Sequence, residues 1–345
     1  MHEDFNVSQW LLDRHVDEGR GERTAIRSGG RSHSYAEVLE RVERLAAGLR
    51  SRGVRPEERI AMVMLDGPDF VTTFLAAMRI GAIPVPTNPL LPGRDLGVII
   101  ADSRARLVVI SEERSGSIDG FRDSAPEVEA IVTTGSEQWL ELASTEGDGS
   151  THRTWRDSPG FWLCTSGTTG MPKLAMHTHG DIRITVETYA RNVLDITEND
   201  RCFSVGPMFH AYGLGNSLTF PFAVGASAIL EPTRPPTPEL VADVVTSEKA
   251  TLFFCIPTFY AALTNSDLPE DTFASVRFGV SAAESLPAET FTKFRDRFGV
   301  TILDGIGSTE LLHIFLSNLP DRHRAGTSGV PVPGYEARII DTDGI

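Results

Sequence analysis

The sequence predicts an α/β fold that consists of two mostly parallel sheets with helices packed on both faces. Segments with strand and helix patterns alternate along most of the chain, which is typical of parallel strands joined by helical crossovers. Several strand segments, such as residues 60–65, are continuous apolar runs and fit strands that are buried on both faces. The length of 345 residues suits about two packed units.

In the first half of the chain, the most clearly marked helix is expected over residues 34–53. Ser34 and Glu37 form a capping-box pattern at its start, apolar residues recur at helical spacing, and Gly53 marks its end. The elements expected after it are a strand over 60–65, a helix over 70–78, a strand over 83–85, a helix over 96–101 and a strand ending at residue 111.

Residues 135–160 are polar and rich in Gly, Ser and Thr, so they are expected to connect a first subdomain (1–160) to a second one (161–345). In the second subdomain we expect strands at 161–165, 202–206, 226–230, 251–255, 276–281 and 300–304, with helices near residues 181, 214, 239, 258 and 288. Chemically distinctive residues follow these strands. Open parallel sheets bind ligands at the carboxyl ends of their strands, so a site is expected there.

The composition bounds the partners and the location of the protein. Lys and Arg number 32 and Asp and Glu number 47, so the formal charge of −15 opposes binding to nucleic acid or to anionic lipid. No apolar run reaches the roughly 18 residues of a membrane helix, and the first residues lack a signal pattern. A cytoplasmic protein with no membrane insertion is expected, and a homodimer is compatible with the sequence. Cys164, Cys202 and Cys255 are predicted to be reduced and buried.

The loop after residues 161–164 has the composition of a phosphate-binding loop. It reads Thr165-Ser166-Gly167-Thr168-Thr169-Gly170-Met171-Pro172-Lys173. The glycines let the backbone approach a ligand, the hydroxyls are donors to an anion, and Lys173 adds a positive charge. It is not a Walker A loop, because Met171 and Pro172 separate Gly170 from Lys173. Composition alone leaves a flexible surface loop as the alternative.

The complete string resembles the signature loop of the adenylate-forming superfamily, which includes acyl- and aryl-CoA ligases, adenylation domains of nonribosomal peptide synthetases and luciferases. Cys164 replaces a frequent Tyr of that signature, and Leu174 replaces the Gly that usually follows the Lys. Four further segments resemble family motifs in the family's order, at residues 207–213, 281–287, 304–310 and 333–341. The resemblance therefore covers residues 165–341.

The resemblance implies roles for individual residues. The residues implied in catalysis are Thr165, Lys173, His210, Thr309 and Glu310, of which Glu310 is the implied Mg²⁺ ligand. Nucleotide binding is implied for Ser166, Gly167, Thr168, Thr169, Gly170, Ala282, Ala283, Glu284, Asp304, Gly305, Ile306, Gly307 and Ser308. Acid binding is implied for Phe209, Ala211, Tyr212, Gly213, Ile306, Gly307 and His313. The strings around His210 and His313 look most like benzoate-CoA and related aryl-CoA ligases, although a structural helix histidine is the alternative for His313.

The function that this resemblance implies is that of an AMP-forming ligase of a carboxylic acid, preferably an aromatic one, and coenzyme A, with ATP and Mg²⁺ as cofactors. A carboxylate and ATP repel each other, so such a site needs donors and cations where charge builds on the phosphate. Family members continue into a small carboxyl-terminal domain, which is expected to be absent from this chain. That absence and Leu174 motivate an alternative, a module that binds a nucleotide or an acyl-adenylate but does not adenylate or needs a partner.

Other chemistries find weaker support in the sequence. His177, His179, His210 and His313 suggest a zinc site, but their spacing does not match one and no cysteine lies close to them. A hydrolase G-x-S-x-G elbow is absent, since Ala283 stands at its second glycine. The sequence from Gly305 onward does not match a dinucleotide-binding fingerprint. Glu310 stands at the position of the third glycine, and its charge would repel pyrophosphate.

Overall fold

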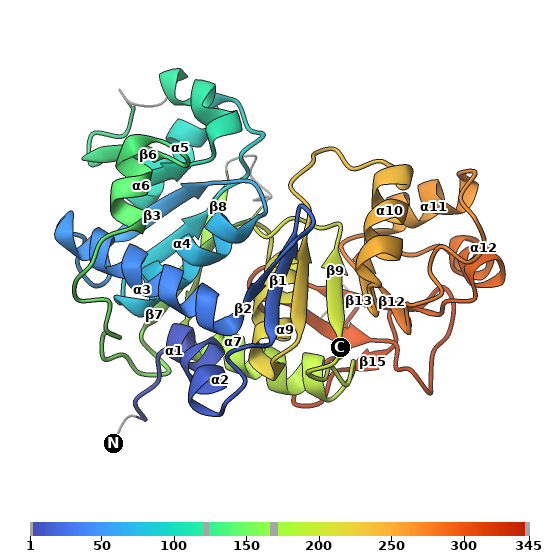
Figure 1. Cartoon of the computed structure of the whole chain (residues 1–345). Coiled ribbons are helices and arrows are strands. Elements are labelled where there is room, and N and C mark those ends of the chain that lie inside the picture. Colours follow the sequence, from blue (N-terminus) through green and yellow to red (C-terminus); the bar gives the residue numbers. More distant parts are fainter. Residues whose placement is uncertain (1–2, 121–123, 166–171, 342–345) are drawn as a thin grey trace.

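The structure is a computed structural model that describes residues 3–120, 124–165 and 172–341. Its described part contains a nine-stranded sheet, a four-stranded sheet and a two-stranded hairpin. Figure 1 shows the four-stranded sheet and its helices on one side of the molecule and most of the nine-stranded sheet on the other. The predicted α/β class with two mostly parallel sheets is confirmed.

The four-stranded sheet is entirely parallel and has the order β4-β3-β5-β6. Its strands are β3 (Arg59–Val63), β4 (Ile83–Pro86), β5 (Ala105–Ile110) and β6 (Ala130–Thr133), and the helices around it are α3 (Tyr35–Ser51), α4 (Pro68–Arg79), α5 (Gly93–Ser103) and α6 (Glu137–Ala143). Alternate residues of β3 face opposite ways: Ile60 joins the core that α3 and α4 share, whereas Ala61 joins the core beneath α5. Both faces of the sheet are therefore covered.

The nine-stranded sheet has the order β15-β14-β13-β12-β11-β9-β10-β1-β2, and its strands from β13 to β1 are parallel. The strands are β1 (Thr24–Ser28), β2 (Arg31–Ser34), β9 (Arg201–Ser204), β10 (Ser227–Leu230), β11 (Leu252–Cys255), β12 (Phe278–Ser281), β13 (Ile302–Gly307), β14 (Ile314–Ser317) and β15 (Val330–Pro331). On one face, Phe253 packs with residues of α10 (Pro238–Glu248), α11 (Pro257–Asn265) and α12 (Ala288–Phe298). On the other face, Phe254 joins the core that includes α9 (Phe220–Val224).

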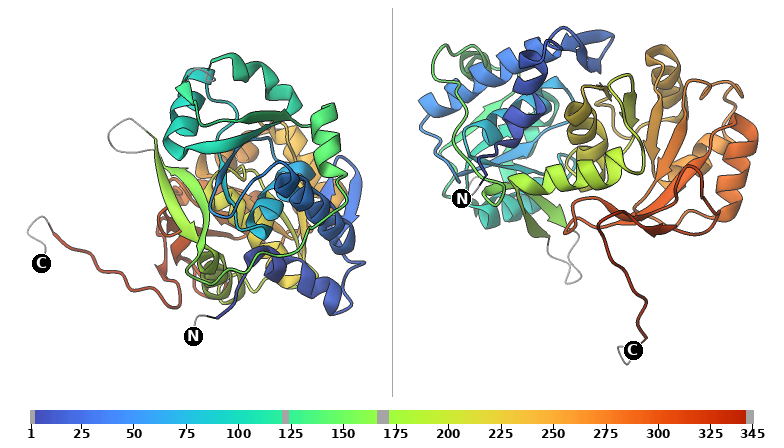
Figure 2. Two further views of the ribbon diagram at one scale, coloured as in Figure 1. Left: turned by 90° about the vertical axis from the view of Figure 1, so that its left-hand side faces the viewer. Right: turned by 90° about the horizontal axis from the view of Figure 1, so that it is seen from below.

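The hairpin pairs β7 (Pro159–Thr165) with β8 (Lys173–Thr178) in antiparallel register. In Figure 2 it forms part of the outer surface, while the chain after residue 335 leaves the body as an extended segment. The remaining elements are α1 (Val7–Leu11), α2 (Asp13–Asp17), α7 (His179–Thr185), α8 (Ala211–Leu214), a 3₁₀ segment (Glu112–Gly120) and two π segments (Val186–Arg191 and Gly215–Thr219).

Most elements expected from the sequence are present, and the predicted capping box of Ser34 and Glu37 closes the start of α3. The segment expected to be a connector, 135–160, contains a helix that the sequence analysis did not predict: α6 forms there with Ser136 as its N-cap and with Trp139 and Leu142 buried. The subdomain boundary at residue 160 stays a prediction, but strand pairing crosses it, since β1 pairs with β10. The sequence also predicts a hairpin turn at the Asp-Gly pair of residues 343–344, which lies outside the described residues.

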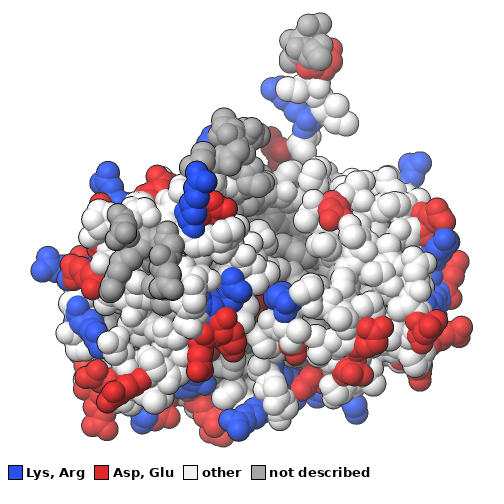
Figure 3. Space-filling view, turned by 90° about the horizontal axis from the view of Figure 1, so that it is seen from above, with Lys and Arg blue, Asp and Glu red and all other residues white. Residues whose placement is uncertain are grey.

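The cysteines are free thiols, as predicted, although Cys164 is half-buried while Cys202 and Cys255 are fully buried. On the face that Figure 3 shows, acidic and basic side chains are interspersed rather than gathered by sign. None of the helices in the described part of the chain combines the length and the apolar character that spanning a bilayer requires.

Three buried histidines make the fold sensitive to acid. Desolvation lowers the pKa of His15 and His179 to about 4 and that of His313 to about 3. Because these values lie below the ordinary value of 6.5, the unfolded chain binds more protons as the pH falls from 6.5 toward 4, and folding stability is lost in that window.

We expect His179→Gln to remove the contribution of His179 to the loss of folding stability at low pH. The wild type should lose on the order of 2 kcal/mol more unfolding free energy between pH 7 and pH 5 than the variant does. Urea denaturation of both proteins at the two pH values measures this difference, and contributions from other groups cancel in it. Equal losses in the two proteins would contradict a neutral, buried His179.

Candidate functional site

A cavity of about 600 Å³ lies at the carboxyl ends of four neighbouring parallel strands. The segments that follow β9, β11, β12 and β13 all contribute to its lining, which is the place where open parallel sheets bind ligands. Of the residues that the sequence assigned to the site, the cavity is lined by His210, Ala211, Tyr212, Gly213, Ala282, Ala283, Glu284, Gly307, Ser308, Thr309 and His313. Motifs up to about 100 residues apart in the chain thus meet in one place.

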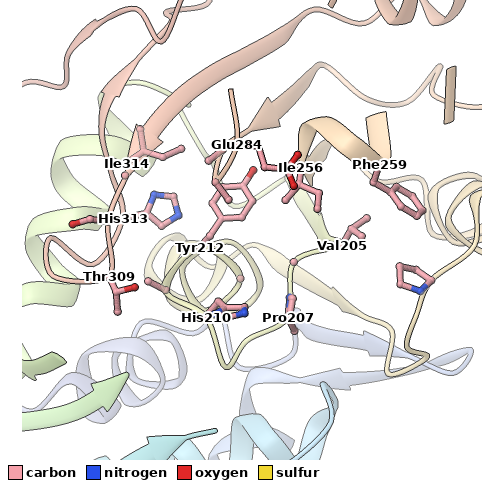
Figure 4. A pocket seen from close by; sticks show the side chains of 18 of the residues that line it. Val205, Pro207, His210, Tyr212, Ile256, Phe259, Glu284, Thr309, His313 and Ile314 are labelled. Atoms are coloured by element: carbon pink, nitrogen blue, oxygen red, sulfur yellow. The ribbon is translucent and has the colours of Figure 1, made fainter. Parts of the chain in front are cut away.

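One wall of the cavity is built from aromatic rings. Figure 4 shows the Tyr212 and His313 side chains next to each other and Phe259 at the opposite end. The Tyr212 ring centroid lies 5.6 Å from that of His313, and its hydroxyl donates to the carbonyl of Val280 at 3.0 Å. This hydrogen bond fixes the ring, and desolvation raises the pKa of Tyr212 well above 10, so the wall stays neutral. A flat, apolar ligand suits such a wall.

His313 lies deep in the same region and is 3% exposed. Its ring packs against Phe220 at 4.5 Å and Tyr189 at 5.2 Å, and its Nε2 lies 3.2 Å from Oδ1 of Asn216. Burial lowers the pKa of His313 to about 3, so the imidazole is neutral near pH 7 and Nε2–H donates to Asn216. Asn216 is a neighbour that the sequence reasoning missed.

The mouth of the cavity carries the polar groups. His210 is exposed to the cavity, its ring rests on the buried Phe209 at 4.4 Å, and desolvation lowers its pKa. Thr309 is half-buried in the turn after β13, and the neighbouring Glu310 is exposed. Glu284 accepts hydrogen bonds from the backbone N–H (3.1 Å) and hydroxyl (2.5 Å) of Thr258 and so ties the segment after β12 to the start of α11.

Seven of the predicted site residues that the structure describes do not line the cavity, namely Thr165, Lys173, Phe209, Asp304, Gly305, Ile306 and Glu310. Phe209 lies behind His210, and Ile306 is 45% exposed on β13. Asp304 is buried and accepts from the Ser281 hydroxyl at 2.8 Å, and desolvation raises its pKa to about 6. A side chain at Gly305 would meet Ile314 and the Leu316 carbonyl at 2.8 Å, so that glycine permits close pairing of β13 and β14. The contacts of Asp304 and Gly305 therefore indicate that these two residues support the structure of the sheet.

Thr165 and Lys173 lie opposite each other at the end of the hairpin where residues 166–172 connect its strands, and Lys173 is exposed beside a second, smaller cavity. Ser166, Gly167, Thr168, Thr169 and Gly170 lie outside the described residues. The strand pleat places Lys173 on the face of β8 that also carries His177, whereas Leu174 is on the opposite face with Trp162. The pleat therefore turns the Leu174 side chain to the other face of the strand, and both Lys173 and Leu174 line the second cavity at the strand end.

The acidic side chains of the site suit a Mg²⁺ ion that is bound jointly by the protein and a phosphate group. Within the described ranges, no group of three or more His, Cys, Asp or Glu side chains forms a ready-made metal site. Mg²⁺ is commonly bound by one or two carboxylates together with substrate phosphates and water, so a single exposed carboxylate such as Glu310 suits it.

An ion pair that the sequence reasoning missed joins the two large sheets at the cavity. Asp66, just beyond β3, accepts from Arg234 at 2.7 Å and from the backbone N–H of Met208 at 3.0 Å. Both charged side chains are at most 10% exposed, and Arg234 lines the cavity. Because Met208 is two residues before His210, this contact fixes the segment that carries the His210 ring.

We expect Asp66→Ala to destabilise the protein by about 3–5 kcal/mol, because it leaves Arg234 as an unpaired buried charge. Asp69→Ala is the matched control: its pair with Arg41 is 2.6 Å long but more than one third exposed, so the loss should stay below about 1 kcal/mol. Urea unfolding of both variants measures the two values. Equal losses would argue against a special role for the buried pair.

Comparisons with known proteins agree with this geometry. The family model described as AMP-binding enzyme matches residues 12–345. The chain is 42% identical to a benzoate-CoA ligase of Thauera aromatica and 38% identical to a 4-hydroxybenzoate-CoA/benzoate-CoA ligase of Rhodopseudomonas palustris. Each match covers 99% of this chain, and the chain spans 66% and 64% of the two relatives. A crystal structure of a benzoate CoA ligase from Burkholderia xenovorans LB400 has a TM-score of 0.91 at 38% identity and covers 99% of this chain, which covers 68% of that one. The chain belongs to the AMP-binding enzyme family.

Proposed function

We propose that the protein activates an aromatic carboxylic acid with ATP for transfer to coenzyme A. The observation that carries the proposal is the aromatic-walled cavity of about 600 Å³ whose mouth bears Thr309 and, beside it, Glu310. Its lining is mostly apolar and includes the polar side chains of His210, Glu284 and Thr309, which suits a ring with one carboxylate. The chain spans about two thirds of the curated relatives' length, so their full activity is carried over here as a proposal.

In the first step, a carboxylate oxygen of the acid bonds to the α-phosphorus of ATP, and the bond from that phosphorus to the bridging oxygen breaks. The products are the acyl-adenylate and pyrophosphate, and no proton is exchanged. The cavity wall of Tyr212 and His313 would hold the ring, while the Thr309 hydroxyl and Lys173 would donate to phosphate oxygens. Mg²⁺, held by Glu310, would neutralise phosphate charge.

In the second step, the sulfur of coenzyme A bonds to the acyl carbon, AMP leaves, and the thiol proton is released. The use of ATP and coenzyme A follows from the family, and the relatives named benzoate-CoA ligases favour an aromatic acid. The cytoplasmic location and the homodimer stay predictions.

The test is pyrophosphate release by the purified protein with ATP, Mg²⁺ and a panel of acids. We expect benzoate or a hydroxybenzoate to exceed medium-chain fatty acids by at least about tenfold, because the rigid wall favours a flat ring. A reaction without Mg²⁺ and one without acid are the controls. Release with medium-chain acids and none with benzoates would overturn the aromatic assignment.

The alternative function, a module that binds an acyl-adenylate without forming it, drew support from Leu174. We expect Leu174→Gly to change the rate of pyrophosphate release by less than about twofold, because the side chain is on the opposite face of the strand from Lys173. Its unfolding free energy should fall by about 1 kcal/mol, because glycine is unfavourable within a strand. Steady-state kinetics and urea unfolding measure the two effects. A variant that gained activity severalfold would favour the alternative.

A further inference from the structure

His177 is a buried histidine that none of the roles above uses. It lies on β8, four residues after Lys173 and on the same face of the strand, and its side chain is 3% exposed. Its ring stacks on its cross-strand partner Phe161, with centroids 5.0 Å apart and an angle of 22° between the planes. The ring is therefore held flat within the hairpin.

Both ring nitrogens of His177 have polar neighbours. Nε2 lies 2.8 Å from the backbone carbonyl oxygen of Thr309, 132 residues further along the chain, and Nδ1 lies 3.2 Å from Oδ2 of Asp181. A carbonyl oxygen and an ionised carboxylate only accept hydrogen bonds, so the two contacts together need a hydrogen on each ring nitrogen, with Nε2–H as the donor to Thr309 and Nδ1–H as the donor to Asp181. This bond joins the hairpin that carries Lys173 to the turn that carries Thr309 and Glu310.

Asp181 is itself held in place. Its carboxylate accepts from the Thr178 backbone N–H at 3.0 Å and from the Thr178 hydroxyl at 2.8 Å, at the start of α7. Burial opposes ionisation, but hydrogen bonds from His177 and Thr178 hold the pKa of Asp181 below its usual range. The orientation of the imidazole is thus set on one side by an ionised, fixed carboxylate and on the other by the ring of Phe161.

The Thr309 carbonyl accepts the hydrogen bonds that hold the conformation of its turn. It also accepts from the Leu312 backbone N–H at 3.1 Å, and Leu312 has a left-handed backbone with φ of 66°. Such a conformation is unfavourable for a residue with a side chain and persists where neighbouring contacts impose it. Glu310 and Leu311, between the two ends of this turn, are exposed and do not anchor it by burial.

We propose that His177 is a positioning residue for the adenylation reaction. Through Nε2–H it fixes the Thr309 backbone, and so it places the Thr309 hydroxyl and the Glu310 carboxylate at the cavity mouth relative to Lys173. The inference rests on the proposed function, in which these groups meet the phosphates and Mg²⁺. His177 acts through Thr309 and does not touch the reacting atoms.

The test compares two substitutions at His177 with one at His179. His177→Phe keeps an aromatic ring against Phe161 and removes the donor, whereas His177→Gln restores an N–H near the position of Nε2. His179→Phe is the matched control: His179 is also buried, but its Nδ1 accepts from the Val7 backbone N–H at 3.1 Å, away from the turn. The readouts are kcat and KM of pyrophosphate release and hydrogen exchange of the Leu312 amide, which shares the Thr309 acceptor.

We expect His177→Phe to lower kcat roughly tenfold while KM for the acid changes by less than about twofold, since the substitution misplaces the phosphate groups and not the ring wall. Exchange of the Leu312 amide should be faster in this variant. His177→Gln should recover kcat to within about threefold of the wild type. His179→Phe should lower the melting temperature and leave kcat and Leu312 exchange unchanged.

The proposal is overturned if His177→Phe matches the wild type in Leu312 exchange, or if His179→Phe lowers kcat as much as His177→Phe does. Failure of the proposed function is a separate outcome, namely a wild type that releases no pyrophosphate with any acid. Hydrogen exchange, which needs no activity, then decides whether His177 holds the turn.

Discussion

The site depends on the parallel register of β9, β11, β12 and β13. Parallel pairing brings the carboxyl ends of neighbouring strands to one edge, so each strand delivers the residues that follow it to the same cavity. The buried faces of these strands fix the register, because a shift by one residue would turn side chains such as Phe253 and Phe254 to the wrong core. The core of the sheet and the geometry of the site are therefore set by one pattern of strand pairing.

Two contacts then join other parts of the molecule to this edge. The Asp66–Arg234 pair connects the end of β3 to the segment before His210, and His177 connects the hairpin to the Thr309 turn. Each contact removes a polar group from water and is costly to leave half-made. Such contacts favour one arrangement of the sheets and the hairpin over arrangements that would bury similar apolar area.

The sequence predicted the elements whose signals are local. The capping box of α3, the apolar runs of the parallel strands and the motifs that follow them need a window of about ten residues. The helix α6 was missed because the Gly, Ser and Thr around it hide a short amphipathic stretch that contains Trp139 and Leu142. Asp66 and Arg234 are 168 residues apart, and His177 and Thr309 are 132 apart, so no local pattern pairs them.

The arrangement of the cavity also bears on how a strongly acidic chain could bind anionic ligands, which composition alone does not explain. In the proposed function, a chain with a net charge of −15 would accept a carboxylate and a nucleotide, and polar groups such as His210 and Thr309 line the cavity. Among the described residues of the aromatic wall, the buried His313 is neutral and the Tyr212 hydroxyl donates to a backbone carbonyl, so this wall offers no cation to a carboxylate. Arg234, at the cavity wall, is neutralised by Asp66. In the proposed reaction, an aromatic acid would therefore lower its free energy by placing its ring in the depth and its carboxylate at the mouth, where the α-phosphorus would be attacked.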